Sequence, residues 1–229
     1  MHMVRWATDQ GIFENDPLVK LPKLDEPEYY PNRPEEQTIN IVFGKIDSRA
    51  LPIFCFMRET GCRKGEAIGL RHDQIDYARN VVTFHTSRRR GTRTKNGKIR
   101  QVPLTSDALA AIQSVPQNGS TVFYHPDSLE PWRDRTLDSF WDRARRRSAK
   151  ANPEEASNCN SLRMHDLRHA YAIMLAEEGC PMHFISEVLG HYSVEFTRKR
   201  YARFSPDSAV QRVLTVIEGR KGTKRAQAV

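Results

Sequence analysis

Five prolines near the start of the chain limit where a folded domain can begin. They are Pro17, Pro22, Pro27, Pro31 and Pro34. Proline lacks the backbone N–H and fixes φ, so this spacing is incompatible with a helix or a central strand. The stretch is therefore predicted to be an extended linker, preceded by a helix through Ile12, and a domain boundary is expected near residue 34.

Beyond the linker, helical patterns dominate, and one central stretch favours strands. Helices are predicted over residues 36–46, 51–58, 64–70, 106–114, 137–150, 166–178, 183–189, 194–204 and 207–218. Residues 81–85 and 100–104 are instead rich in β-formers and flank Asn96-Gly97, which predicts a β-hairpin. The predicted fold is mainly α with a small antiparallel β-sheet, an α+β class.

Charge and composition restrict the classes of partner. The chain has 36 Lys and Arg against 28 Asp and Glu, a net charge of +8, which favours a polyanionic partner. No apolar run approaches the roughly 20 residues that span a bilayer. The four cysteines form no C-x-x-C pair, so neither a disulfide framework nor a zinc site is indicated. A cytoplasmic protein without a membrane partner is expected.

One short stretch without an acidic residue concentrates positive charge. Its basic residues are Arg88, Arg89, Arg90, Arg93, Lys95, Lys98 and Arg100. Such a stretch is typical of a loop that contacts DNA phosphates, although a solvated turn would have the same composition. A second basic run at residues 143–150 ends a predicted helix, where cations also complement the helix dipole, so both interpretations stay open there.

Several residues could together cleave a phosphodiester without a metal. That chemistry needs a nucleophile, cations on the non-bridging oxygens and an acid for the leaving oxygen. His165 and Arg168 are three residues apart and share a helix face, while Arg63 offers a second guanidinium. A continuous helix would separate His191 from Tyr201 by about 15 Å. A break after Gly190 is therefore needed to bring both to one site.

Four motifs resemble the tyrosine recombinases, or phage-type integrases, and occur in that family's order. They are Thr60-Gly61-Cys62-Arg63-Lys64-Gly65-Glu66-Ala67, Thr94-Lys95-Asn96-Gly97-Lys98 running into Val102-Pro103-Leu104, His165-Asp166-Leu167-Arg168-His169-Ala170, and Leu189-Gly190-His191 followed by Thr197 and Tyr201. The resemblance covers nearly the whole chain after the linker. It implies the integrase catalytic-domain fold.

The resemblance also implies a catalytic set and a reaction. The matching residues are Arg63, Lys95, His165, Arg168, His191 and Tyr201. The two arginines would clamp the phosphate of double-stranded DNA, the lysine would protonate the 5′ oxygen, and the tyrosine would form a 3′-phosphotyrosine. His165 would exchange a proton with the tyrosine, and His191 would hydrogen-bond a phosphate oxygen. The family requires no metal, nucleotide or other cofactor.

Some residues near these motifs have alternative interpretations. Lys98 could replace Lys95 as the acid, since both lie beside the same turn. Tyr192 is a competitor for the nucleophile, because the interval from His191 to Tyr201 is one residue longer than in many members. Glu66 is expected to hold the Arg63 side chain or a neighbouring amide, and His169 to support the site or the core. No third ligand accompanies the two histidines of the same helix, which argues against zinc.

The resemblance also gives a domain plan. Residues 1–33 are expected to be the end of an N-terminal core-binding domain and a linker, residues 34–219 the catalytic domain, and residues 220–229 a basic tail. The chain is then a fragment or a short member. A tetramer on DNA and association with the nucleoid are expected. The rival hypotheses are a type IB topoisomerase and a catalytically idle DNA-binding module, and the sequence does not distinguish integration from excision.

Overall fold

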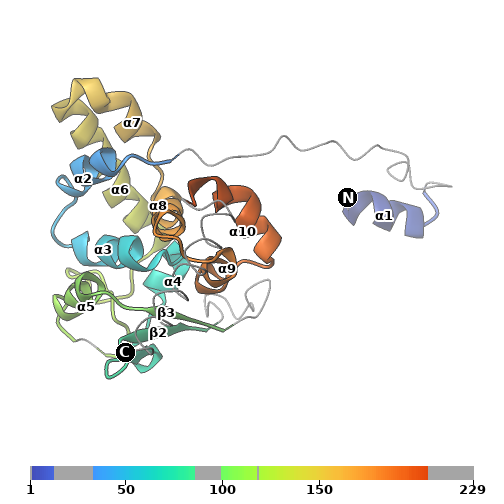
Figure 1. Cartoon of the computed structure of the whole chain (residues 1–229), viewed down its shortest axis with the longest axis horizontal. Coiled ribbons are helices and arrows are strands. Elements are labelled where there is room, and N and C mark those ends of the chain that lie inside the picture. The colour runs from blue at the N-terminus through green and yellow to red at the C-terminus, as the bar shows by residue number, and fades with distance from the viewer. Residues whose placement is uncertain (1, 13–32, 86–98, 118, 206–229) are drawn as a thin grey trace, which may run out of the picture. The chain divides into compact units, whose positions relative to one another are not determined.

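Figure 1 shows the computed structural model of the chain, which describes residues 2–12, 33–85, 99–117 and 119–205. The chain divides into two compact units, Met1–Tyr30 and Pro31–Val229. In the first unit, the predicted N-terminal helix is observed as α1 (His2–Asp9). It ends before Gly11, whose φ of 73° is in the left-handed region. No helix of the described residues is long and apolar enough to cross a membrane.

The second unit is mostly helical, as predicted. Its α-helices are α2 (Glu36–Phe43), α3 (Leu51–Thr60), α4 (Lys64–Ile68), α5 (Ser106–Gln113), α6 (Asp134–Ala151), α7 (Ala156–Ser161), α8 (Met164–Glu177), α9 (Met182–Leu189) and α10 (Val194–Tyr201). Short 3-10 turns lie at η1 (His72–Gln74), η3 (Pro153–Glu155) and η4 (Ala202–Phe204). Helix α7 was not predicted. The helix predicted over residues 207–218 lies outside the described residues.

A three-stranded antiparallel sheet interrupts the helices. Its strands are β1 (Ile75–Asp76), β2 (Val81–Phe84) and β3 (Arg100–Pro103), in the order β1-β2-β3. The pairing of β2 with β3 confirms the predicted hairpin strands, with Val82 opposite Val102 and Phe84 opposite Arg100. The intervening Asn96-Gly97 lies outside the described residues. Strand β1 was missed, because two residues are too few to give an alternating pattern.

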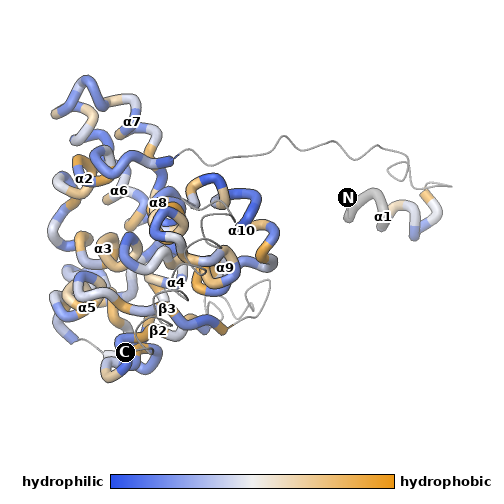
Figure 2. The backbone as a smooth tube through the Cα atoms, viewed as in Figure 1, coloured by the Kyte–Doolittle hydropathy of each residue, from blue (hydrophilic) through white to orange (hydrophobic). Residues whose placement is uncertain are grey.

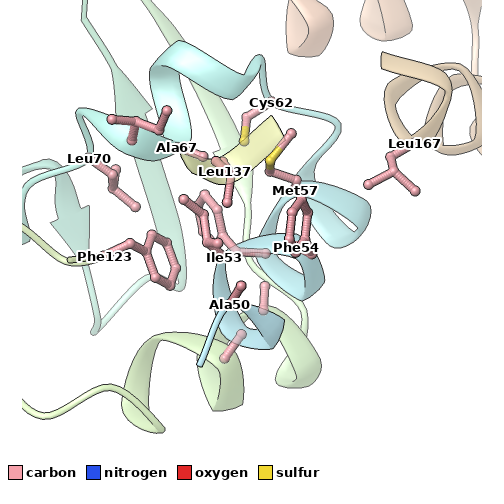
Figure 3. Close-up of a cluster of buried hydrophobic side chains, with 14 of the residues drawn as sticks. Ala50, Ile53, Phe54, Met57, Cys62, Ala67, Leu70, Phe123, Leu137 and Leu167 are labelled. Atoms are coloured by element: carbon pink, nitrogen blue, oxygen red, sulfur yellow. The ribbon is translucent and has the colours of Figure 1, made fainter. Parts of the chain in front are cut away.

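The main core lies between α3, the sheet and the helices packed against them. Figure 3 shows Ile53 and Phe54 of α3 among the apolar side chains of this cluster, together with Phe123 and Leu137. Figure 2 shows hydrophobic residues, coloured orange, along α3 and α5. Burying such a side chain contributes about 1.5–3 kcal/mol, so α3, with Ile53, Phe54, Phe56 and Met57 buried, contributes strongly to this core.

A second, smaller cluster joins α8, α9 and α10. Its buried members are Tyr171, Ala172, Ile173, Ala176, Ile185, Leu189 and Tyr201. Helix α8 belongs to both clusters, because Leu167 is buried in the main core and Tyr171, one turn later, in the second. Arg168 lies between these two residues on α8. This helix therefore connects the body of the unit to α9 and α10 through the residues expected to carry the chemistry (Figure 1).

Candidate active site

The first predicted arginine is held by the turn between α3 and α4. Helix α3 ends at Gly61, which has a φ of 59°, and a Cβ there would lie 2.5 Å from Cδ1 of Tyr171. The chain then turns into α4 with Arg63 as its N-cap. The backbone N–H of Arg63 donates to Oε2 of Glu66 at 2.7 Å, and its guanidinium donates to Oε1 at 3.1 Å. Glu66 thus holds both groups, as predicted.

The second predicted arginine is buried. Arg168 is 3% exposed, and its guanidinium donates to the carbonyl of Gly61 at 2.8 Å and to the carbonyl of Leu189. Burial, followed by the positive charges of Arg63 and Arg100, lowers the pKa of Arg168 to about 9. The side chain is therefore still protonated at neutral pH. Its carbonyl partners are uncharged, so its positive charge remains available to an anion.

The two guanidiniums meet at the C-terminal end of α9. Arg63 donates to the carbonyl of Gly190 at 3.3 Å, while Arg168 donates to the preceding carbonyl, that of Leu189. Gly190 is the C-cap of α9 with a φ of 66°, so the helix breaks where the sequence predicted. Residues from three distant parts of the chain are thereby brought to one place.

His191 follows this break and contacts α10. Ser193 caps α10, as predicted, by accepting a hydrogen bond from the Phe196 N–H at 3.2 Å. Nδ1 of His191 is 2.8 Å from Oγ1 of Thr197, and the ring lies nearly parallel to that of Tyr201, with centroids 6.3 Å apart. Burial, followed by the positive charges of the two arginines, lowers the pKa of His191 to about 3, so this imidazole is neutral at pH 7.

The predicted nucleophile is enclosed. Tyr201 ends α10, is 1% exposed, and its hydroxyl is 2.7 Å from Nδ1 of His169. His165 lies one turn earlier on α8, with its ring edge-on to that of His169 at 4.9 Å. Burial lowers the pKa of both histidines, that of His169 to about 4. The histidine that hydrogen-bonds the Tyr201 hydroxyl is thus His169 and not His165. His169 was expected to have only a supporting role.

The placement of Arg100 corrects an expectation. It was predicted to contact DNA, but its side chain is 6% exposed and donates to Glu66 at 2.7 and 2.5 Å and to the Val188 carbonyl at 2.8 Å. A guanidinium enclosed and paired in this way is not available to a DNA backbone. Strand alternation could have revealed this, because Arg100 and Val102 share the buried face of β3.

The remaining predicted cations lie between β2 and β3 in the sequence. Lys95 and the loop residues Arg88, Arg89, Arg90, Arg93 and Lys98 lie outside the described residues.

His191 lines an open hollow of about 460 Å³ between the start of β3 and the segment from α9 into α10. Within residues 2–12, 33–85, 99–117 and 119–205, no three His, Cys, Asp or Glu side chains gather as a metal site would require.

Comparison with known proteins decides the family. Residues 35–207 match the model of the phage integrase family. The chain belongs to this family. It is 34% identical over 166 residues to tyrosine recombinase XerD of Bifidobacterium longum, covering 70% of this chain and 51% of that protein. The integrase of Salmonella phage P22 is 28% identical over 156 residues, covering 66% and 38% of the two chains. This integrase-family chain thus spans about half the length of the curated relatives it matches.

Solved structures agree on the fold. The Tn1549 transposon integrase, determined in complex with a circular intermediate DNA, aligns with a TM-score of 0.68 at 15% identity, over 93% of this chain and 74% of that one. The catalytic domain of bacteriophage HP1 integrase aligns with a TM-score of 0.55 at 22% identity, over 79% and 92% of the two chains. The integrase catalytic-domain fold expected from the motifs is confirmed.

Proposed function

We propose that this chain cleaves and rejoins double-stranded DNA as a site-specific tyrosine recombinase, through a 3′-phosphotyrosine on Tyr201. One observation carries the proposal. Arg63 and Arg168 bind consecutive carbonyls directly before His191, and the His191 ring in turn faces that of Tyr201. The names of its relatives, tyrosine recombinases and integrases, and the DNA in the Tn1549 complex support the same function.

Each side chain has a role in the proposed cleavage step. The phenol oxygen attacks phosphorus and the bond to the 5′ oxygen breaks, while the two guanidiniums offset the negative charge on the non-bridging oxygens. His191, being neutral, donates one hydrogen bond to a phosphate oxygen. Lys95 is proposed to protonate the leaving 5′ oxygen. The 5′ hydroxyl of a partner strand then attacks the phosphotyrosine, which restores the phosphodiester and frees the phenol.

The tyrosine needs a proton acceptor in this step. A phenol with a pKa of about 10 is ionised to roughly one part in a thousand at pH 7. Neutral His169, hydrogen-bonded to the hydroxyl, can accept the proton in the resting arrangement. His165, one turn along α8, can take this role once Tyr201 turns toward the phosphate. Because the phenol is buried, we propose that DNA binding moves the end of α10.

Several parts of the proposal concern the rest of the molecule. The basic stretch from Arg88 to Lys98 is proposed to contact DNA phosphates. Residues 1–33 would end a core-binding domain, residues 34–219 form the catalytic domain, and residues 220–229 a basic tail. Four copies would assemble on DNA, in the cytoplasm and on the nucleoid.

A suicide-substrate assay tests the chemistry. The chain is incubated with a pool of nicked duplexes that have a randomised centre, so that the short 5′-hydroxyl fragment diffuses away after cleavage and the covalent adduct accumulates. We expect a denaturant-stable adduct for the wild type, with the phosphate mapped to Tyr201 by mass spectrometry, and none for Tyr201→Phe.

Three results would contradict the proposal. They are a phosphate on Tyr192, an equal adduct with Tyr201→Phe, or DNA binding without any adduct across the pool. Plasmid relaxation without strand exchange would assign the same cleavage chemistry to a type IB topoisomerase instead.

A further inference from the structure

A hydrogen bond behind His191 is not explained by the roles proposed so far. Nδ1 of His191 is 2.8 Å from Oγ1 of Thr197, which lies one turn before Tyr201 on α10. Thr197 is fully buried, at 0% exposure. A hydroxyl removed from water in this way needs a partner, and among the described residues His191 is its only hydrogen-bond partner.

The direction of this bond decides what His191 can do. A neutral imidazole has one N–H donor and one bare acceptor nitrogen, and the partner of one nitrogen determines the state of the other. Burial and the charges of Arg168 and Arg63 lower the pKa of His191 to about 3, so the ring has a single hydrogen. If that hydrogen were on Nδ1, Nε2 would turn a lone pair toward an anionic phosphate, which is repulsive.

The surroundings of Thr197 favour the hydroxyl as donor. Threonine in a helix often donates to a carbonyl one turn earlier. Thr60 does so, with its hydroxyl 2.7 Å from the Phe56 carbonyl. In the described part of the chain, the Thr197 hydroxyl makes no such bond, and its hydrogen is free to point at Nδ1 of His191.

We propose that Thr197 donates to Nδ1 of His191 and so keeps the ring hydrogen on Nε2, where a phosphate oxygen can accept it. Thr197 is thus a positioning residue that acts through His191. This inference rests on the proposed function, since the phosphate contact of His191 belongs to that proposal. It also connects the helix of the nucleophile to the group that steadies the phosphate.

Two substitutions distinguish the contribution of the Thr197 hydroxyl from that of its methyl group. Thr197→Val keeps the branched shape without the hydroxyl, and Thr197→Ser keeps the hydroxyl. Removing the hydrogen-bond partner of a metal-binding histidine typically lowers activity roughly 10- to 100-fold, and we take the same range for a histidine that binds phosphate. We expect a loss of this size for Thr197→Val in the single-turnover rate of adduct formation on the nicked duplexes. Thr197→Ser should stay close to the wild type. Equal losses in both variants, or no loss in the valine variant, would overturn the inference.

A spectroscopic measurement on the full chain needs no cleavage. Histidines are labelled with nitrogen-15, and the His191 signals are assigned by their absence in His191→Asn. Long-range proton–nitrogen correlations then show which ring nitrogen bears the hydrogen. We expect Nε2 in the wild type and in Thr197→Ser, and a mixture in Thr197→Val. A wild-type hydrogen on Nδ1 would overturn the inference. Failure of the wild type to form any adduct would instead count against the proposed function.

Discussion

The two active-site arginines are held in different ways. Arg63 shares the carboxylate of Glu66, and 43% of its side chain is exposed, whereas Arg168 is buried on neutral carbonyls. A single ammonium cannot reproduce the two divergent bonds of the Arg168 guanidinium. We expect Arg168→Lys to slow adduct formation by about two to three orders of magnitude, the usual cost of removing one preorganised hydrogen-bond donor, because the charge is kept but its position is not. Single-turnover assays measure this.

The control for Arg168→Lys is on the same helix. Arg163, the N-cap of α8, has a side chain that is 62% exposed and pairs with Asp166 at the surface. Arg163→Lys makes the same chemical change away from the two carbonyls, so its rate should stay within a few-fold of the wild type. Equal effects of the two substitutions would show that the position of Arg168 is not special.

Glu66 links the site to stability and to pH. Burial alone would raise its pKa, but the hydrogen bonds and charge of Arg100, assisted by Arg63, outweigh burial and lower it from 4.5 to about 2. A lowered carboxyl pKa stabilises the folded chain above pH 4.5, and this contribution is lost as the pH falls toward 2. Glu66→Gln should therefore lower the free energy of unfolding at pH 7 by about 3 kcal/mol, since it leaves Arg100 buried without its counter-charge.

Urea unfolding at several pH values measures the effect of Glu66→Gln. The variant should also lose the decline in stability between pH 4.5 and 2 that Glu66 contributes. Glu36→Gln is the control, because the Glu36 side chain is 66% exposed where it pairs with Arg58. Exposed pairs contribute at most about 1 kcal/mol. A cost for Glu66→Gln no larger than that of Glu36→Gln would contradict the prediction.

At single residues, the motifs predicted which side chains gather at the candidate site but not all of their contacts. Arg63, Arg168 and His191 lie together, as the resemblance implied. Which histidine of α8 reaches Tyr201 depends on how α8 and α10 cross, and spacing along one helix does not determine that. Arg100 was assigned to DNA because charge patterning was considered without strand alternation.

At the scale of elements, the turn from α3 into α4 depends on Gly61. Its φ of 59° costs another residue roughly 1–2 kcal/mol, and the Cβ would overlap the ring of Tyr171. Forcing extra atoms into a packed site costs about 1–3 kcal/mol more. Gly61→Ala should thus destabilise the chain by about 2–5 kcal/mol and displace the carbonyl that Arg168 binds.

Gly65→Ala provides the matched control for Gly61→Ala. Gly65 lies inside α4, and nothing stands within 4 Å of its missing Cβ. In a helix interior, alanine is more favourable than glycine by up to about 1 kcal/mol. Urea midpoints should therefore move in opposite directions for the two variants. An unchanged or higher urea midpoint for Gly61→Ala would mean that neither the conformation of Gly61 nor the Tyr171 contact limits stability.

Most helices were predictable, including the five-residue α4, whereas α7 and β1 were not. Helices α3, α5, α9 and α10 lie where apolar spacing and caps indicated, because several turns of pattern agree in each. Helix α7, with two serines and two asparagines, has only one buried residue, Cys159, and is stabilised by packing on α6 rather than by its own pattern. Whether such a short helix forms depends on tertiary contacts, which cannot be read from its local sequence pattern.

At the scale of the whole molecule, the second core cluster encloses Tyr201, the proposed nucleophile. Tyr201 is 1% exposed while nearby Tyr192 is 65% exposed, so the two differ sharply in access to reagents. In the DNA-free chain, tetranitromethane should nitrate Tyr192 and spare Tyr201, as measured by mass spectrometry of peptides. Addition of a bound duplex should increase the labelling of Tyr201, if α10 moves as proposed. Equal labelling of both tyrosines without DNA would contradict the enclosed position.

The net charge of +8 favours binding to a polyanion, and DNA is the polyanion of the proposed function. Each phosphate contact contributes about 0.9 to the slope of log affinity against log salt. Replacing Arg88, Arg89 and Arg90 together with alanine should thus reduce the slope by up to about 2.7, as measured by fluorescence anisotropy on duplex DNA. The matched triple lysine variant keeps the charge and should keep the slope. Counterion release depends on the number of charges and not on the shape of the guanidinium. If the lysine variant bound DNA as weakly as the alanine variant, these arginines would act through the hydrogen-bond geometry of the guanidinium and not through charge alone.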